Sequence, residues 1–247
     1  MRKTLISLLL LFITGTVIGA DDLNIVFIGN SITYGATLED PATEATPVKV
    51  CKYIEQQTGR NVNYRNCGVG GMTTVDFLPA STHQFPNVIK NADEMSKLKG
   101  KLIFSISLGT NDSSDDCFGS PVVPAQYYTN MQVIIDELLR HYPKALVVVQ
   151  YPIWYSPNTY NGARYMQKGL NRLQTYPEMI DRLMEHYAQA GKSQVFPGSK
   201  RGYDFFKENY KLFTAEKGNA GIFYLHPNKD GAVELGKIWS EGILKIL

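Results

Sequence analysis

Cysteine is scarce in this sequence, and its spacing excludes two kinds of site. The 247-residue chain has three cysteines, Cys51, Cys67 and Cys117, and no two of them stand in CxxC spacing. Such a set indicates neither a structural zinc site nor a disulfide framework. Ordinary buried thiols are the simpler interpretation, and one bridge of unassigned pairing is the alternative.

An excess of positive charge is also absent, and so are three well-known catalytic signatures. The 25 Lys and Arg stand against 23 Asp and Glu, a formal net charge of +2. Nucleic-acid binders concentrate basic side chains, so the composition argues against a nucleic-acid partner. There is no GxSxG serine elbow and no HExxH zinc helix, and a phosphate loop ending at Lys192 would need a glycine where His186 stands.

The N-terminal residues MRKTLISLLLLFITGTVIGA carry two cations, an apolar run and small residues before Asp21. The uninterrupted apolar stretch from Leu8 to Ile13 is short for a spanning helix, which favours a signal peptide over residues 1–20 with cleavage near Ala20. Residues 21–247 then form one domain, with a net charge of zero because two cations and no acid are lost. We expect an exported protein, periplasmic or secreted, without stable membrane insertion.

Four short apolar runs, rich in β-branched or aromatic residues, predict buried strands. They are LNIVFIG from Leu23, VNYRNCG from Val62, KLIFSISLG from Lys101 and ALVVVQY from Ala145. Helical patterns alternate with them. They are a helix from Thr46-Pro47 to Gly59, an amphipathic stretch around Met131 to Leu139, a long helix over roughly 171–190 and a last helix from about Lys229. This alternation predicts a parallel sheet with helices on both faces.

Residues 151–168, YPIWYSPNTYNGARYMQK, interrupt the pattern and predict a long loop that carries several aromatic rings. The rings either pack against the domain itself or offer a platform for a sugar. On the second interpretation, Trp154 and Tyr155 are candidates for substrate contact. Arg164 is a candidate partner for a sugar carboxylate, although an exposed loop arginine is ordinarily only solvated.

Polar, glycine-rich segments follow three of the predicted strands: GNSIT at 29–33, NCGVGGMTT at 66–74 and GTND at 109–112. Ligands of open parallel sheets bind outside the carboxyl ends of the strands. Ser31, Gly71 and Asn111 are each 40 residues apart, about one strand–helix unit, so we expect them at the same level of neighbouring strand ends. An enzyme that transfers acyl groups can use a serine as nucleophile, an imidazole as its base and fixed N–H groups as donors to the oxyanion.

Taken in order with FYLHPN at 223–228, these blocks resemble those of the SGNH hydrolases, also called GDSL-type esterases and lipases, over nearly the whole of residues 21–247. The resemblance implies Ser31 as nucleophile and oxyanion donor, Gly71 and Asn111 as further oxyanion donors, and His226 as general base. The expected fold is then α/β, a flavodoxin-like three-layer α/β/α sandwich with a central parallel sheet of about five strands.

Two positions depart from the family pattern. Asn30 stands where Asp is common, beside the nucleophile, and Phe223 stands three residues before His226, where the family usually has its acid. We therefore predict a Ser31–His226 dyad in which a main-chain carbonyl or a distant polar side chain accepts the Nδ1 proton of His226.

The remaining polar candidates have weaker claims. Asp112 is expected to hydrogen-bond its loop, and His83 is a minor candidate for ligand contact. His141 is expected at the end of a helix, where a cation is favourable, and His186 is expected inside a helix.

The function expected from these features is a serine esterase that removes O-linked acyl groups, above all acetyl, from a carbohydrate of the sialic acid or hemicellulose type. Neither a metal nor a cofactor is expected, and the sequence predicts no oligomeric state. A lysophospholipase or thioesterase is one alternative. A non-catalytic carbohydrate-binding protein on the same scaffold is another, suggested by Phe223.

Overall fold

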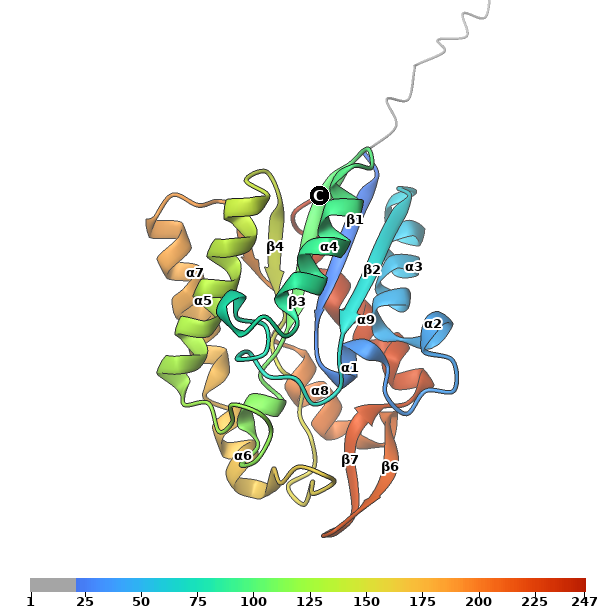
Figure 1. Cartoon of the computed structure of the whole chain (residues 1–247). Helices are drawn as coiled ribbons and strands as arrows, with labels where there is room; N and C mark the ends of the chain where they lie inside the picture. The colour runs from blue at the N-terminus through green and yellow to red at the C-terminus, as the bar shows by residue number, and fades with distance from the viewer. Residues whose placement is uncertain (1–20) are drawn as a thin grey trace, which may run out of the picture.

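A five-stranded parallel sheet lies at the centre of the molecule (Figure 1). The computed structural model describes residues 21–247. The strand order is β2-β1-β3-β4-β5, and every neighbouring pair is parallel. The strands are β1 (Leu23–Gly29), β2 (Val62–Gly68), β3 (Lys101–Ser107), β4 (Leu146–Val149) and β5 (Val195–Pro197). The expected α/β sandwich is confirmed, and β5 is the strand that the sequence patterns did not locate.

Helices cover both faces of this sheet. The helices α4 (Phe85–Ser96) and α5 (Pro124–His141) lie in front of it in Figure 1, and α9 (Lys229–Leu244) lies behind it. The helix α3 (Thr46–Thr58) packs against α9, and α7 (Tyr176–Gln189) packs against α5. All seven residues of β1 are buried, because an inner strand of a sheet with helices on both sides has no face exposed to solvent.

Three of the four helical predictions are confirmed, including the last helix, which is α9 and begins at Lys229, and one is wrong. The helix α3 ends at Gly59, whose left-handed φ of 67° suits a glycine C-cap, and α5 buries the predicted apolar stripe. The expected helix over 171–190 is instead α6 (Met166–Leu173) followed by α7. Pro177 explains the break, because a proline has no N–H for a preceding turn and its ring clashes with a continuous helix.

A separate two-stranded antiparallel hairpin, β6 (Phe213–Gly218) and β7 (Gly221–Pro227), lies beyond the carboxyl ends of the sheet strands and is drawn at the bottom of Figure 1. The hairpin was not predicted. Short helices α1 (Ser31–Tyr34), α2 (Pro41–Glu44) and α8 (Gly202–Glu208), with 3₁₀ turns η1 (Pro79–Ser81), η2 (Asn111–Ser113) and η3 (Tyr210–Leu212), complete the order of elements.

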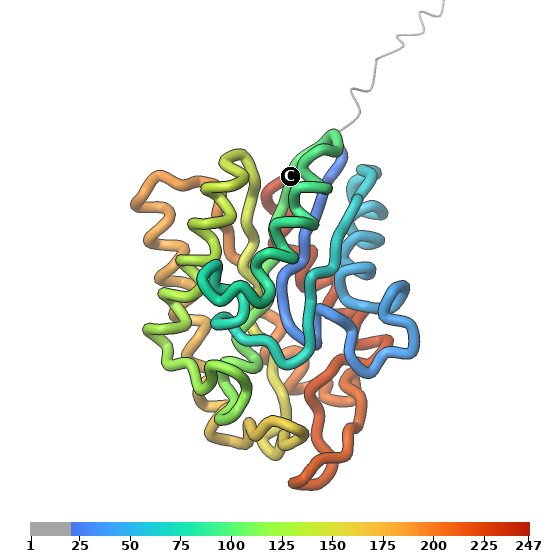
Figure 2. The backbone as a smooth tube through the Cα atoms, viewed as in Figure 1, coloured from blue at the N-terminus to red at the C-terminus, as the bar shows by residue number. Residues whose placement is uncertain are grey.

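The register of the sheet aligns the polar segments that follow its strands. Gly29 at the end of β1 pairs with Gly68 of β2 and with Ser107 of β3. The segments that carry Ser31, Gly71 and Asn111 therefore leave the sheet at the same level, as the even spacing predicted. Figure 2 shows the start of β1 and the C-terminus at the opposite end of the sheet from these segments and the hairpin.

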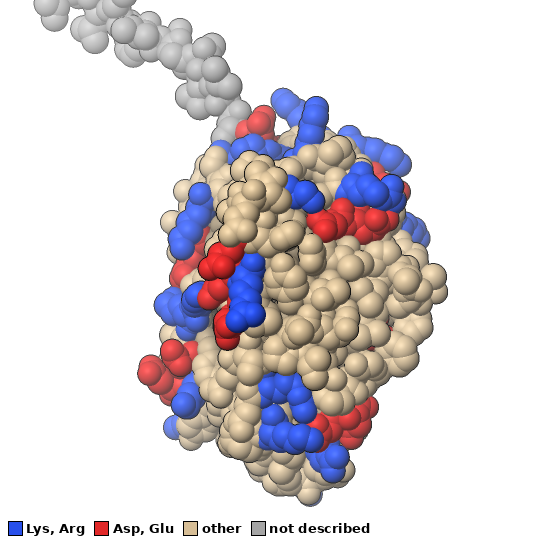
Figure 3. Space-filling model, turned by 90° about the vertical axis from the view of Figure 1, so that its left-hand side faces the viewer, with Lys and Arg blue, Asp and Glu red and all other residues tan. Residues whose placement is uncertain are grey.

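Charges of both signs are interspersed on the face drawn in Figure 3, which is the left-hand side of Figure 1. Surface ion pairs of the described residues include Arg182–Glu178 and Lys192–Asp136. None of the helices within residues 21–247 is both long enough and apolar enough to cross a membrane. The predicted signal peptide lies outside the described residues.

Candidate active site

Ser31 is the first residue of α1, directly after β1 reaches the carboxyl edge of the sheet. Asn30 caps this short helix, because its Oδ1 accepts the Ile32 N–H at 3.0 Å. An asparagine oxygen caps a helix as an aspartate oxygen does, so Asn30 preserves the turn that presents Ser31. The serine side chain is 9% exposed and lies at the wall of a pocket.

His226 lies against Ser31 and joins it to an acid. Its Nε2 is 2.9 Å from Ser31 Oγ, and its Nδ1 is 2.9 Å from both carboxylate oxygens of Glu216. The prediction of a carbonyl partner for Nδ1 is therefore wrong, and the alternative of a distant polar side chain is what the structure has. Ser31, His226 and Glu216 form a continuous hydrogen-bonded relay of nucleophile, base and acid.

Glu216 reaches the histidine across the β6–β7 hairpin. Glu216 pairs directly with Phe223, so the acid stands on the neighbouring strand opposite the position where the family usually has it. Between the pairs Ala215–Tyr224 and Phe213–Pro227, β7 has one residue more than β6. This β-bulge shifts the alternation of side chains and brings His226 to the side of Glu216.

Ser31 and Gly71 line the same pocket, and each brings a backbone N–H to it. Within the described part of the chain, neither Ser31 N–H nor Gly71 N–H donates a hydrogen bond, so both are free for a ligand. Gly71 has φ of +78°, a conformation that an L side chain rarely adopts, and a Cβ built there meets no atom within 4 Å. The constraint at Gly71 is therefore the backbone conformation rather than space.

Asn111 begins η2, directly after the loop that follows β3. Its Nδ2 donates to the Met72 carbonyl at 2.8 Å, and its Oδ1 accepts the Tyr165 hydroxyl at 2.7 Å. The Met72 contact joins the second polar segment to the third. One hydrogen of Nδ2 is left without a partner among residues 21–247, so this amide can donate to a bound oxyanion.

Asp112 has the structural role that was expected, since it ties its own loop to the second polar segment. Its Oδ1 accepts both the Thr74 N–H and the Thr74 hydroxyl, whereas Oδ2 has no hydrogen-bond partner among residues 21–247. Burial raises the pKa of the Asp112 carboxyl to about 6, although its hydrogen bonds with Thr74 lower it.

The four residues expected to carry the chemistry, Ser31, Gly71, Asn111 and His226, line one pocket of about 400 Å³. Its other lining residues are Ala36, Cys117, Asn161, Gly162, Ala163 and Tyr165. Within residues 21–247, no cluster of three or more His, Cys, Asp or Glu side chains is placed to hold a metal ion.

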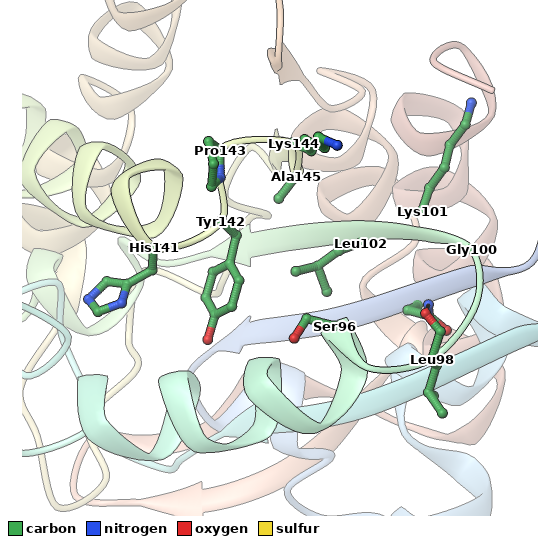
Figure 4. Close-up of a pocket in the computed structure, with 11 residues that line it drawn as sticks. Ser96, Leu98, Gly100, Lys101, Leu102, His141, Tyr142, Pro143, Lys144 and Ala145 are labelled. Carbon is green, nitrogen blue, oxygen red and sulfur yellow. Dashed lines mark hydrogen bonds between the residues drawn. The ribbon is translucent and has the colours of Figure 1, made fainter.

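A second pocket, of about 500 Å³, lies at the amino ends of the strands, away from the hairpin (Figure 4). Its histidine and its serine are already engaged, because His141 contacts Glu137 at 3.2 Å and Ser96 donates to the Asp93 carbonyl at 3.0 Å. It holds no nucleophile–base pair, so the pocket with Ser31 is the candidate active site.

Comparison with known proteins agrees with this geometry. The model of the GDSL-like lipase/acylhydrolase family matches residues 27–233. The chain belongs to this family. As a member of the GDSL-like family it is a carboxylic ester hydrolase. Among curated proteins, none matches the chain.

Solved structures share the fold of this esterase. A family 3 carbohydrate esterase of Clostridium thermocellum aligns with a TM-score of 0.63 and 15% identity over 90% of this chain and 96% of its own. A lipase/acylhydrolase of Enterococcus faecalis aligns with a TM-score of 0.54 and 18% identity over 88% and 93%. A two-domain esterase active on acetylated mannans aligns with a TM-score of 0.55 and 17% identity over 89% of this chain, which spans 47% of that protein.

The prediction of an aromatic platform is wrong for Trp154 and Tyr155. Tyr155 is fully buried and Trp154 is 9% exposed, packed against Phe213, so neither ring offers a face to a sugar. The loop instead packs its rings against the domain, because aromatic side chains of this size gain most from burial. Arg164 is half-exposed and lies 3.6 Å from Asp115, and its role in substrate binding stays a prediction.

The other polar candidates lie apart from this esterase's relay. His83 contacts the buried Asp76 at 3.1 Å and does not line the pocket of Ser31. His141 ends α5, as expected, and His186 lies within α7. All three cysteines are free thiols, so no bridge joins Cys67 to Cys117.

Proposed function

We propose that this GDSL-family hydrolase is a serine esterase that removes small O-linked acyl groups, above all acetyl, from a carbohydrate. The observation that carries the proposal is the relay Ser31 Oγ–His226 Nε2 at 2.9 Å and His226 Nδ1–Glu216 at 2.9 Å. Such a relay activates a hydroxyl that is otherwise a weak nucleophile.

In the proposed mechanism, Ser31 Oγ attacks the ester carbonyl carbon while His226 Nε2 takes the hydroxyl proton. Glu216 holds the imidazole in the required tautomer and stabilises its positive charge. The N–H groups of Ser31 and Gly71 and the amide of Asn111 donate to the tetrahedral oxyanion. His226 then gives the proton to the departing sugar oxygen, and a water molecule, deprotonated in the same way, releases the acid from Ser31.

The preference for a small acyl group rests on the pocket walls. The side chains beside Ser31 are short or polar, including Ala36, Asn161 and Ala163, and the lining contains no Leu, Ile, Val or Phe. A long acyl chain gains affinity by burying apolar surface, and these walls offer little of it. A polar, sugar-like alcohol with a short acyl group fits them better.

Two similar folds suggest which substrates to test, since one belongs to an esterase active on acetylated mannans and another to a family 3 carbohydrate esterase. The choice between acetylated hemicellulose and acetylated sialic acid is part of the experiment. The alternative of a non-catalytic binder was suggested by Phe223, which stands where the family usually has its acid. Glu216 weakens that alternative, because it supplies an acid from the neighbouring strand.

The test is hydrolysis of p-nitrophenyl acetate and of a panel of acetylated glycans by the wild type and by Ser31→Ala. We expect the variant to lose roughly 10⁴-fold or more in kcat, since removal of a serine nucleophile abolishes the acyl-enzyme route. Equal activity of the two proteins would exclude the serine mechanism. Rates that rise along a series of nitrophenyl esters of increasing chain length would favour a lysophospholipase or thioesterase instead.

Activity of the wild type should fall at acidic pH. His226 Nε2 must be unprotonated to accept the Ser31 proton, so protonation of the ring stops the first step. The pH profile of kcat/KM on p-nitrophenyl acetate measures this, and a flat profile through the acidic range would contradict His226 as the base.

A further inference from the structure

Tyr165 connects the aromatic loop to the oxyanion donors. Its side chain is 3% exposed, and its hydroxyl donates to Asn111 Oδ1 at 2.7 Å, across 54 residues of sequence. Tyr165 belongs to a segment of the loop, residues 156–166, that we call the strap. The strap runs from the hairpin, where the Ser156 N–H donates to the Tyr224 carbonyl at 2.9 Å, to the loop after β3, where the Asp115 N–H donates to the Arg164 carbonyl at 2.9 Å.

The contacts of Asn111 fix which way its amide faces. The Met72 carbonyl can only accept a hydrogen bond, so the amide group 2.8 Å from it must be Nδ2. Oδ1 then faces Tyr165, whose hydroxyl must be the donor in the 2.7 Å contact. The amide is thus held at both of its ends, with the second Nδ2 hydrogen left for a ligand.

Tyr165 and the neighbouring Cys117 both stay protonated, which lets the Tyr165 hydroxyl act as a hydrogen-bond donor to Asn111. Burial raises the pKa of the Tyr165 hydroxyl well above its ordinary value, so it stays protonated. Cys117 Sγ lies 3.8 Å from the same hydroxyl, and burial raises the pKa of that thiol too. The thiol hydrogen can therefore point to the tyrosine oxygen while the tyrosine hydrogen points to Asn111.

We propose that Tyr165 is a positioning residue that sets the orientation of the Asn111 amide for oxyanion stabilisation. The inference rests on the proposed role of Asn111 as an oxyanion donor. A donor aimed in advance at the developing charge lowers the barrier more than one that must rotate into place. Donation from Tyr165 to Oδ1 also polarises the amide and strengthens its remaining N–H as a donor.

The experiment compares Tyr165→Phe with Tyr155→Phe as a matched control. Both changes remove one buried hydroxyl from neighbouring rings whose centroids are 5.4 Å apart, but the Tyr155 hydroxyl contacts Ser113 Oγ at 2.9 Å and not Asn111. On p-nitrophenyl acetate we expect Tyr165→Phe to lower kcat roughly tenfold with KM little changed, and the control to stay within about twofold. Thermal melting confirms that each variant is folded at the assay temperature.

A double-variant cycle separates orientation from general support of the fold. In an Asn111→Ala background, Tyr165→Phe should cost no more than about twofold in kcat, because the group that it positions is already gone. An undiminished tenfold loss in that background would overturn the inference, and so would wild-type kcat in Tyr165→Phe beside an impaired Asn111→Ala. Wild-type kcat in Asn111→Ala would instead remove the oxyanion role in the proposed function, and the inference with it.

Discussion

Glu216 adds a full negative charge beside the imidazole, where a backbone carbonyl would add only a partial one. The charge matters most when His226 becomes protonated during acyl transfer. Both carboxylate oxygens lie 2.9 Å from Nδ1, and Oε1 also accepts the His226 N–H at 3.3 Å. The acid therefore holds the ring and the backbone of the same residue.

Glu216→Gln tests that charge. The substitution keeps the length of the side chain but removes the charge and offers an NH₂ group that favours the wrong imidazole tautomer. We expect kcat to fall by roughly 10²- to 10⁴-fold with the fold intact, as seen when a triad acid is neutralised. Steady-state kinetics on p-nitrophenyl acetate measure the fall, and Lys217→Gln, on the adjacent exposed residue, serves as control. A Glu216→Gln variant with near wild-type kcat would show that the acid is dispensable.

The sequence predicted Ser31, Gly71, Asn111 and His226 at one site because each belongs to a short local pattern. Glu216 belongs to none, since it meets His226 only through strand pairing. A signal was present, however: the β-rich runs FTAEK and IFYLH flank the turn residues GNAG, which is a hairpin pattern. Pairing those runs would have placed Glu216 opposite Phe223.

At the scale of elements, Arg172 joins α6 to residues 113–115, which follow β3 in the chain. Its Nη1 donates to the carbonyls of Ser113 and, at 3.2 Å, Ser114, and its Nη2 lies 3.3 Å from Asp115. The side chain is 14% exposed, so these contacts are partly shielded from water. The residues that they fix lie just after Asn111 in the chain, and α6 begins directly after Tyr165.

We expect Arg172→Met to lower the free energy of unfolding by roughly 1–3 kcal/mol, because the carbonyls of the loop lose charge-assisted hydrogen bonds while an apolar stem of similar length remains. Chemical denaturation measures the change. Arg182→Met is the control, since Arg182 makes an exposed pair with Glu178 within α7, and its removal should change stability by less than about 0.5 kcal/mol. Equal effects of the two substitutions would contradict the anchoring role of Arg172.

The prediction of helices and strands was most accurate where the apolar residues of one element recur with the period of that element and are buried. The strands β1 to β4 and the helices α3 and α5 have such patterns. The three-residue strand β5 is too short to show one, and the apolar pattern alone predicts one helix over 171–190, which Pro177 interrupts. For Trp154 and Tyr155, a loop rich in Pro, Asn and Gly left both a packed and an exposed position open, and tertiary contacts decide for the packed one.

On the scale of the whole molecule, Asp112 makes stability depend on pH. Its carboxyl has a pKa of about 6 when folded, above the ordinary value of 3.8, because burial disfavours the charged form. The folded state therefore binds the proton more tightly than the unfolded chain. Stability from this group is fully present below about pH 4 and is lost as pH rises through about 6, a change on the order of 3 kcal/mol.

Asp112→Asn should remove this dependence while keeping an oxygen for Thr74. We expect the melting temperature of the variant, relative to the wild type, to rise between about pH 4 and pH 7 and to level off above that range. Melting curves of both proteins across this range measure it. A difference that is constant with pH would mean that Asp112 does not titrate with folding.

The sheet accounts for how a chain with weak single motifs still forms one site. Parallel pairing sets Gly29, Gly68 and Ser107 level, so three loops emerge together, and the sequence spacing was enough to predict this. The β6–β7 hairpin pairs with itself and not with this sheet, so its position depends on tertiary contacts that no local pattern records.

The three residues of the relay come from two separate parts of the fold, the hairpin and the sheet. His226 and Glu216 are on the hairpin, and Ser31 follows β1 of the sheet. A rigid displacement of the hairpin would lengthen the 2.9 Å contact between Nε2 and Oγ and leave the contact between Nδ1 and the carboxylate unchanged. The imidazole would keep its tautomer while the serine lost its base, so the reactivity of Ser31 depends on how closely the hairpin is held against the sheet.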